Sequence, residues 1–485
     1  MKNQAMLLVI LGFAFGLRVT LLAQRPIWYD EAFSILLAER DMAAIIRGTA
    51  ADVQPPLYYI LLHVWLGLGE NVFVLRFLSV ALSLLAVALV YTIARRWYSE
   101  RVGALASFLT ALAPFQVYHA QELRMYALFT VGGLIYWSGV SQPLARRRHR
   151  FILITVGALL ALSAHNLGIL ALVAANIYLL LKRAWREQCE LLAVQGLALV
   201  AFAPWLLSLP TQIGSIQRAY WTQSPGLTDV LQMLMLFTTY LPLPVPILAF
   251  ALFVTLAIFA LLMFEWWRVF RRGEPGEPGL LLACVLGPPA LMFALSFLMR
   301  SVFIPRGVIA SAAAYYVLLA EVAARAPRFG QRALVGLTFL AASSGLPFYF
   351  SAWGEWRRAP FAEADRFLRA QIQSDDLILH DNKLSFFPMH FYDRSLRQEF
   401  LADPPGSAND TLARGSQEAM GLFPVEFAAA TRGQSRVWFV IFQTAIDEAA
   451  HEGHDHANVS RLDAAMRCAQ VTAFGDLRIY QYEMQ

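Results

Sequence analysis

The sequence predicts an α-helical polytopic membrane protein that carries a small α/β domain at its C-terminal end. Of its 485 residues, 58% are hydrophobic and only 15% are charged, whereas a soluble chain of this length carries about 25% charged residues. The mean hydropathy is +0.51, and many apolar runs approach the roughly 20 residues that a spanning helix needs. After residue 351 these runs end, and short helix and strand patterns alternate instead.

The apolar runs predict roughly eleven spans, some of them short. They lie near residues 5–24, 72–94, 102–118, 123–141, 151–164, 166–181, 191–208, 244–266, 279–299, 304–323 and 332–350. Basic clusters fall on every second connection, and the positive-inside rule makes those connections cytoplasmic. The long connections and the C-terminal domain are then expected on the extracytoplasmic side. The net charge of +5 reflects this topology, so nucleic acid is not an expected partner.

The first outer connection, residues 25–71, is expected to contain two helices lying on the membrane surface. The stretch DEAFSILLAERDMAAIIRG (30–48) has apolar residues at helical spacing, and so has PPLYYILLHVWLGLG (55–69), which two prolines open. A third surface helix is expected within residues 227–241.

Two domains are therefore expected, a membrane domain over residues 1–350 and a soluble domain over residues 351–485. In the second, EADRFLRAQIQ is typical of an amphipathic helix, and DLILHD, RVWFVIF and LRIYQYEM are typical of strands. The stretches DPPGSANDTLARGSQ and AHEGHDHANVS are expected to be loops.

Asp30 and Glu31 form an acidic pair directly after the first apolar run, in WYDEAFS. On spacing alone a solvated helix start explains the pair equally well, since acidic residues favour the first turn of a helix. The aromatic neighbours Trp28, Tyr29 and Phe33 suit an interfacial cleft. The pair is therefore a candidate catalytic site.

Ionisable residues at the outer ends of later spans are candidate partners of this pair, because such residues usually face a polar cavity. Arg124 and Arg306 are candidates for binding a phosphate, as arginine binds phosphate oxygens through two donors, and Arg76 is a further candidate. A structural Glu122–Arg124 pair and arginines anchored at lipid headgroups are the alternative interpretations. Further pocket candidates are Asp52, Gln54, Tyr58, Tyr59, His119, Glu122 and Tyr126.

One of these and several histidines have plainer interpretations. Asp52 is equally explained as a cap of the helix that the prolines open, and His165 is expected at the surface of a turn between spans. His451, His454 and His456 lie close together in the sequence, and histidine side chains can bind metal ions. A solvated loop explains them as well. The sequence predicts no metal site and no certain cofactor. It leaves open whether the activity depends on a divalent metal.

Three motifs resemble those of the GT-C glycosyltransferases that use polyprenyl-phosphate sugars, most closely the bacterial branch related to protein O-mannosyltransferases and lipid A aminoarabinose transferases (glycosyltransferase family 39 or 83 type). They are WYDEAFS, the stretch from DVQPPLYY to LSVALSLL, and ALAPFQVYHAQELRMYAL, and VFIPRGVIAS is similar to a later arginine motif. The resemblance covers residues 1–350. Gln54 and Gly307 depart from the pattern, which often has histidine and tyrosine there.

The resemblance implies an inverting transfer of a sugar from a polyprenyl-phosphate donor to an extracytoplasmic acceptor at the bacterial cytoplasmic membrane. It implies that Asp30 is the general base, that Glu31 supports it, and that the arginines hold the donor phosphate. The acceptor, whether lipid A, another glycan or a protein, is not specified, and neither is the sugar.

Two other functions remain as hypotheses. A transporter or lipid flippase would use the same ionisable residues along a path, but transporters tend to show repeated halves, and here the ionisable residues gather at one face. A scaffold with a ligand-binding C-terminal domain would not need Asp30 and the arginines.

Overall fold

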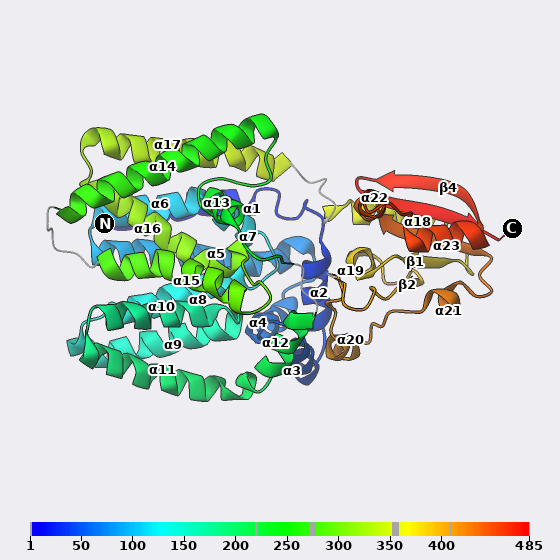
Figure 1. The fold of residues 1–485 in the computed structure, drawn as a ribbon, viewed down its shortest axis with the longest axis horizontal. Helices are drawn as coiled ribbons and strands as arrows, with labels where there is room; N and C mark the ends of the chain where they lie inside the picture. The colour runs from blue at the N-terminus through cyan, green and yellow to red at the C-terminus, as the bar shows by residue number, and fades with distance from the viewer. Residues whose placement is uncertain (1, 219–221, 272–277, 352–357, 408, 485) are drawn as a thin grey trace. The chain divides into compact units, whose positions relative to one another are not determined.

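The computed structural model describes residues 2–218, 222–271, 278–351, 358–407 and 409–484 (Figure 1). The chain forms two compact units. The helical unit comprises Met1–Leu22, Val53–Gln217 and Trp221–Ser351, and the α/β unit comprises Ala23–Asp52, Arg218–Tyr220 and Ala352–Gln485. The expected domain boundary near residue 350 adjoins residues 352–357, which lie outside the described residues. The grouping of residues 23–52 with the C-terminal part was not expected from the sequence.

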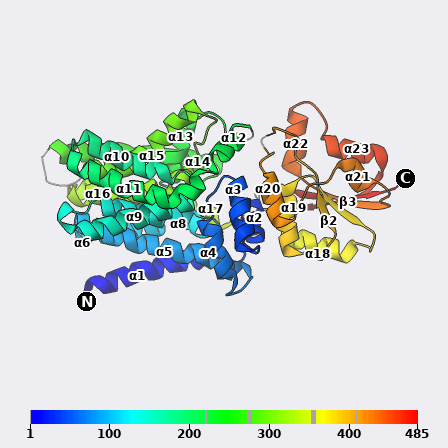
Figure 2. The same cartoon turned by 90° about the horizontal axis from the view of Figure 1, so that it is seen from below.

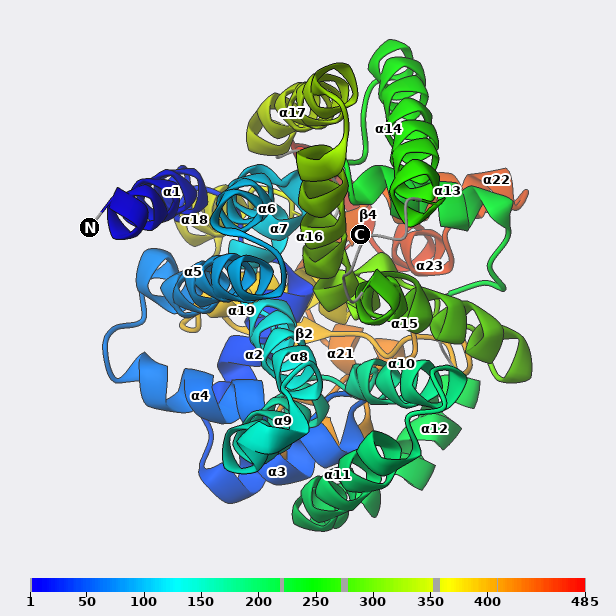
Figure 3. The same ribbon diagram turned by 90° about the vertical axis from the view of Figure 1, so that its left-hand side faces the viewer.

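The helical unit is built from long helices that Figure 3 shows nearly end-on. Its α-helices are α1 (Lys2–Val19), α4 (Leu57–Leu66), α5 (Val72–Trp97), α6 (Glu100–Leu112), α7 (Pro114–Ala120), α8 (Tyr126–Val140), α9 (Arg147–Ala164), α10 (Gly168–Leu181), α11 (Trp185–Leu206), α12 (Leu209–Arg218), α13 (Leu227–Leu236), α14 (Val245–Arg271), α15 (Pro278–Leu298), α16 (Ile309–Arg325) and α17 (Arg328–Ser351). Two 3₁₀ turns, η1 (Leu144–Arg146) and η2 (Pro305–Val308), precede α9 and α16.

The predicted helical membrane fold is confirmed. Within the described residues, six helices are long and apolar enough to cross a membrane, namely α5, α11, α14, α15, α17 and the continuous segment of η2 and α16. The expected number of eleven spans stays a prediction, because several of the other apolar helices are shorter than 18 residues.

The expected span 102–118 is broken into α6 and α7 at Ala113. Pro114 follows, and the ring of a proline disfavours the helical conformation of the residue before it. Ala113 accordingly has ψ 119°, outside the helical region, and Pro114 occupies the first position of α7. The break ends the long helix just before the segment that carries His119, Glu122 and Arg124.

Helices α8 and α9 approach each other closely through glycines. A Cβ on Gly157 would lie 2.2 Å from the backbone nitrogen of Tyr136, and a Cβ on Gly132 would lie 2.6 Å from that of Ala161. Small residues allow helix backbones to pack together in a membrane, where dispersion contacts replace the hydrophobic effect. This contact fixes the start of α8, where Tyr126 lies.

The α/β unit combines two helices of the first connection with the whole C-terminal part. Its elements are α2 (Tyr29–Ala38), α3 (Met42–Ala51), α18 (Phe361–Gln371), β1 (Leu377–His380), α19 (Lys383–Tyr392), β2 (Gln398–Phe400), α20 (Arg414–Met420), α21 (Phe427–Thr431), β3 (Arg436–Phe442), α22 (Gln443–His451), α23 (Ala457–Ala465), β4 (Arg467–Phe474) and β5 (Leu477–Glu483).

Five strands form one sheet in the order β2-β1-β3-β5-β4. β1 pairs in parallel with both β2 and β3, and β5 pairs antiparallel with β3 and β4. Helices cover both faces of this sheet (Figure 2). On one face Ile378, Trp438 and Ile479 pack against α18 and α19, and on the other Leu379 and Phe439 pack against α21 and α23. Strands buried on both faces read as continuous apolar runs, which is why LILH and RVWFVIF were recognisable.

Several sequence expectations for this unit were wrong in detail. The single surface helix expected over residues 30–48 is two helices, because α2 ends at Ala38 and Asp41 caps α3 by accepting a hydrogen bond from the Ala44 amide (2.8 Å). Helices α20, α22 and α23 extend into the two stretches expected to be loops. Strands β2 and β4 were not predicted.

Candidate active site

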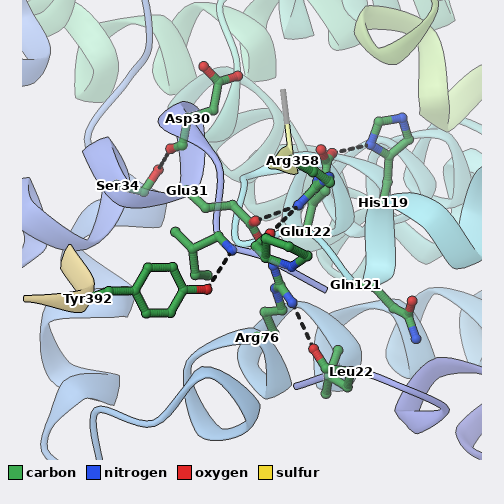
Figure 4. A network of polar contacts seen from close by, with 12 residues as sticks. Leu22, Asp30, Glu31, Ser34, Arg76, His119, Gln121, Glu122, Arg358 and Tyr392 are labelled. Atoms are coloured by element: carbon green, nitrogen blue, oxygen red, sulfur yellow. Dashed lines mark hydrogen bonds and ion pairs between the residues drawn. The ribbon is translucent and has the colours of Figure 1, made fainter. Parts of the chain in front are cut away.

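The acidic pair lies in the first turn of α2, and its two carboxylates have different surroundings. Asp30 is half-buried, whereas Glu31 is fully buried. Trp28 begins the helix without a side-chain cap, and the Ser34 hydroxyl donates to the Asp30 carbonyl oxygen (2.8 Å). Figure 4 shows the two side chains pointing in different directions. One turn of helix therefore presents one accessible and one enclosed carboxylate.

The enclosed carboxylate is bound by Arg358, which the sequence interpretation missed. Arg358 Nη1 donates to Glu31 Oε2 (2.8 Å) and to the Pro26 carbonyl oxygen (3.1 Å) (Figure 4). Its guanidinium carbon also lies 5.2 Å from the centroid of the Trp28 ring, within the range of a cation–π interaction. Arg358 is only 4% exposed. A buried glutamate in WYDEAFS requires a buried cation, but the sequence alone did not indicate which.

Helix α19 holds the same segment from a second direction. The Phe387 ring contacts the rings of Tyr29 (5.3 Å between centroids) and Phe33 (6.4 Å). The Ile27 amide donates to the Tyr392 hydroxyl (2.9 Å). The residues around the acidic pair are thus fixed by the C-terminal part of the chain.

In the helical unit, the segment after α7 gathers the predicted polar residues. His119 Nδ1 and Glu122 Oε2 lie 2.8 Å apart and both side chains are buried (Figure 4). Arg124 Nη1 donates to the Tyr59 hydroxyl (3.3 Å), and Tyr59 is fully buried. Glu122 therefore pairs with His119, while Arg124 extends toward α4.

A second arginine reaches the same region from η2. The guanidinium carbon of Arg306 lies 5.8 Å from the centroid of the Tyr126 ring, and that ring lies 4.6 Å from the ring of His119. His165, in the turn between α9 and α10, is buried rather than at the surface as expected, because the rings of Tyr126 and Phe129 pack against it. Burial, together with the positive charges of Arg306 and Arg124, lowers the pKa of His165 to about 3. Two arginines therefore act on one neutral imidazole.

The remaining predicted residues of the helical unit differ in burial and in hydrogen bonding. The hydroxyls of Tyr58 and Ser79 are hydrogen-bonded (2.9 Å), and Ser79 also donates to the Arg124 carbonyl oxygen (3.4 Å). Gln54 has a buried Oε1 that accepts no hydrogen bond from the described residues. Arg76 is fully buried and its Nη1 donates to the Leu22 carbonyl oxygen (2.8 Å), as Figure 4 shows.

Asp52 does not cap the helix that the prolines open. It ends α3 in the α/β unit, and the helix α4 begins at Pro56 without a side-chain cap. The helix α4 follows Pro55 and Pro56, and the fixed φ of proline favours a helix start.

A search of the described residues found no group of three or more histidine, cysteine, aspartate or glutamate side chains that could hold a metal ion. The three histidines of the stretch AHEGHDHANVS contact different groups. His451 Nδ1 approaches the Asp447 carbonyl oxygen (2.7 Å), His454 pairs with Glu452, and His456 lies 3.6 Å from Asp381.

Comparison with known proteins supports a membrane-protein fold shared with sugar transferases. Residues 53–207 match a family described as "Dolichyl-phosphate-mannose-protein mannosyltransferase". No curated protein sequence matches the chain significantly. Among solved structures, ArnT from Cupriavidus metallidurans in the apo state aligns with a TM-score of 0.65 at 13% identity, covering 99% of this chain and 98% of that chain.

Two further structures give the same fold. ArnT from Cupriavidus metallidurans bound to undecaprenyl phosphate aligns with a TM-score of 0.64 at 15% identity, over 98% of this chain and 97% of that one. The Archaeoglobus fulgidus oligosaccharyltransferase in the apo form aligns with a TM-score of 0.51 at 12% identity, over 91% of this chain and 69% of that one.

Proposed function

We propose that this chain is a polytopic membrane glycosyltransferase of the GT-C superfamily, which transfers a sugar from a polyprenyl phosphate to an acceptor outside the cytoplasm; the family match and the shared fold support this proposal. The proposed setting is the bacterial cytoplasmic membrane, with the α/β unit on the extracytoplasmic side. The acceptor is a lipid, glycan or protein that carries a hydroxyl or amino group.

The observation that carries this proposal is the group formed by Arg124, Arg306 and Tyr126 in the helical unit. Arg124 donates to the Tyr59 hydroxyl, the Arg306 guanidinium lies near the Tyr126 ring, and the charges of both arginines lower the pKa of His165. Positive charge among apolar helices is costly, and a bound anion would offset part of that cost. Arginine matches phosphate oxygens geometrically, so a lipid-linked phosphate suits this group.

The chemistry assigns Asp30 as the general base. Its carboxylate takes the proton of the acceptor hydroxyl or amine, and the acceptor electron pair attacks the anomeric carbon. The bond from that carbon to the phosphate oxygen breaks, and its electron pair leaves with the polyprenyl phosphate. Attack from the face opposite the leaving group inverts the configuration.

Cations are needed most in the transition state. The donor is a phosphodiester with one negative charge, and the leaving polyprenyl phosphate gains a second as the bond breaks. Donors placed where charge develops lower the barrier more than they strengthen ground-state binding. We assign this role to Arg124 and Arg306, with Arg76 as a further candidate, and no general acid is required.

Pocket residues then have binding roles. The buried Gln54 Oε1, which accepts no hydrogen bond from the described residues, can accept one from a sugar hydroxyl. Tyr58, Tyr59 and Tyr126 are buried, and in this proposal they shape the pocket that holds the sugar and Arg124. His119 and Glu122 support the turn that carries Arg124.

The test uses purified full-length protein and a panel of undecaprenyl phosphates that each carry a hexose or an aminopentose. Wild-type protein should release undecaprenyl phosphate in the presence of membrane extract as acceptor, and Asp30→Asn should lower kcat by about 100-fold or more, the usual contribution of a general base. Equal transfer by the wild type and Asp30→Asn would refute the assignment of the base. Movement of the lipid across vesicles without donor consumption would favour the flippase hypothesis.

A further inference from the structure

Arg358 joins three points of the first connection that lie within six residues of one another. One nitrogen of its guanidinium group binds the Pro26 carbonyl oxygen and the Glu31 carboxylate, and the planar group faces the Trp28 ring. Both Arg358 and Glu31 are buried. These contacts span the point at which the chain enters α2.

The start of α2 has backbone hydrogen bonds to the Trp28 carbonyl oxygen but no side-chain cap. Trp28 has extended backbone angles and supplies no side-chain cap to the helix. A helix start without a cap leaves its first amides without a side-chain partner. The direction in which α2 leaves Trp28 therefore depends on contacts from outside the helix, and Arg358 contacts residues on both sides of this point.

We propose that Arg358 is a positioning residue, which orients Asp30 by holding Glu31, Pro26 and Trp28 as one rigid corner. Asp30 is the neighbour of Glu31 in the first turn of α2, so a rotation of this turn moves both carboxylates together. The hydrogen bond from Arg358 fixes the Glu31 carboxylate. Because both residues lie on one turn, the same hydrogen bond sets the direction of the Asp30 carboxylate. Glu31 then acts through Arg358 and not on the acceptor.

The chemistry of the site distinguishes Arg358 from a simple attachment. The cation–π contact with the Trp28 indole favours the planar guanidinium group. A lysine can keep the ion pair with Glu31 but not this contact in the same form. Arg394, by contrast, binds Glu39 at the other end of α2 (2.5 Å) and is largely exposed. It attaches the same helix without contacting its start.

Because this inference rests on the proposed function, the experiment has one readout that depends on catalysis and one that does not. The variants are Arg358→Ala, Arg358→Lys and Glu31→Gln, with Arg394→Ala as the matched control. The first readout is hydrogen exchange of the peptide covering residues 26–34 in the full-length protein in detergent. The second is kcat and KM with the undecaprenyl-phosphate sugar on which the wild type is active.

In Arg358→Ala, exchange of residues 26–34 should quicken at least about tenfold, since a buried, charge-assisted contact is lost. The kcat should fall by about 100-fold, as small displacements of a reacting group do, while the KM for the donor stays within about threefold. Arg358→Lys should lie between the wild type and Arg358→Ala in both readouts. Arg394→Ala should match the wild type in both.

The pair should also behave as a unit. Adding Arg358→Ala to Glu31→Gln should lower kcat by less than about threefold more, because residues that act through one contact are not additive. Glu31→Gln with an unchanged kcat, or multiplicative losses in the double variant, would refute a joint action.

Three further outcomes decide between the claims. Unchanged exchange in Arg358→Ala overturns the hold on α2, whatever the activity. Faster exchange with unchanged kcat overturns the positioning role. A wild-type protein that transfers no sugar from any donor overturns the proposed function and with it the role of Asp30, and the exchange result then still decides whether Arg358 orders the start of α2. If Arg358→Ala does not fold, Arg358→Lys carries the same two tests.

Discussion

The carboxyl group of Asp365 in α18 should make the stability of the α/β unit fall as the pH rises from about 4 to about 8. Asp365 is 3% exposed, and neither of its carboxyl oxygens has a hydrogen-bond partner among the described residues. Burial and the neighbouring charge of Asp393, opposed by that of Arg369, raise its pKa to about 8. Arg369 Nε donates to Asp393 Oδ2 (2.7 Å). The charge of Arg369 is therefore largely balanced by Asp393 and lowers the pKa of Asp365 only in part.

The magnitude follows from the two protonation states. At pH 7 the folded state keeps the proton of Asp365, whereas the unfolded chain, with the ordinary value of 3.8, has released it. The folded state therefore binds more protons than the unfolded state between these two values, so the free energy of unfolding decreases with increasing pH. At about 1.4 kcal/mol per pH unit, the loss by pH 7 amounts to at most about 4 kcal/mol.

Asp365→Asn removes the titrating group and should therefore raise the free energy of unfolding at pH 7, by up to about 4 kcal/mol less the cost of an unpartnered amide. The assay is hydrogen exchange of α18 in the full-length protein at pH 5, 6, 7 and 8, corrected for the intrinsic exchange rate. Wild type should lose protection with increasing pH and Asp365→Asn should not. The exposed Asp375, changed to asparagine, is the matched control. The same pH dependence in wild type and Asp365→Asn would refute the reasoning.

Three other substitutions should have specific effects. Gly157→Leu should lower the melting temperature of the purified protein by more than about 5 °C, because its side chain would enter the backbone of α8, whereas Gly336→Leu, with open space around it, should not. Arg306→Ala should weaken binding of undecaprenyl phosphate in calorimetry by about tenfold or more, and weaker acceptor binding alone would contradict its role. Asp376→Asn removes the buried carboxylate that binds Arg436 and should lower the free energy of opening of β1 by about 3 kcal/mol in hydrogen exchange; an unchanged value would contradict this.

The sequence predicted the class of fold because that class depends on local patterns. Apolar runs identified the membrane helices and the strands β1 and β3, and β5 was identified although only part of its residues are buried. Strand β4 escaped notice since it is exposed along most of its length and so has no alternating pattern, and β2 has only three residues. The break at Asp41 was missed because the apolar spacing continues across it, although an aspartate before a helical run is a recognised cap.

The candidate site was predicted in part, and the missing portion depends on distant pairs. Arg124 and Arg306 were recognised because charges at the ends of apolar runs need an explanation. Arg358 was not, as its partner Glu31 lies 327 residues away and nothing in the residues around position 358 indicates that partner. The surroundings of His165 were missed for the same reason, since Tyr126 and Phe129 come from another helix.

The different burial of Asp30 and Glu31 explains why an acidic pair serves better here than one acid. A buried ion pair often stabilises a protein no more than apolar side chains of the same volume would, because both charges lose their hydration. The Glu31–Arg358 pair is therefore better explained by the orientation that it imposes than by the stability that it adds. Orientation matters only if a neighbouring group must be aimed, and Asp30, half-buried on the same turn, is that group. Replacing both members of the pair by well-packed apolar residues should therefore leave the melting temperature nearly unchanged and still lower kcat.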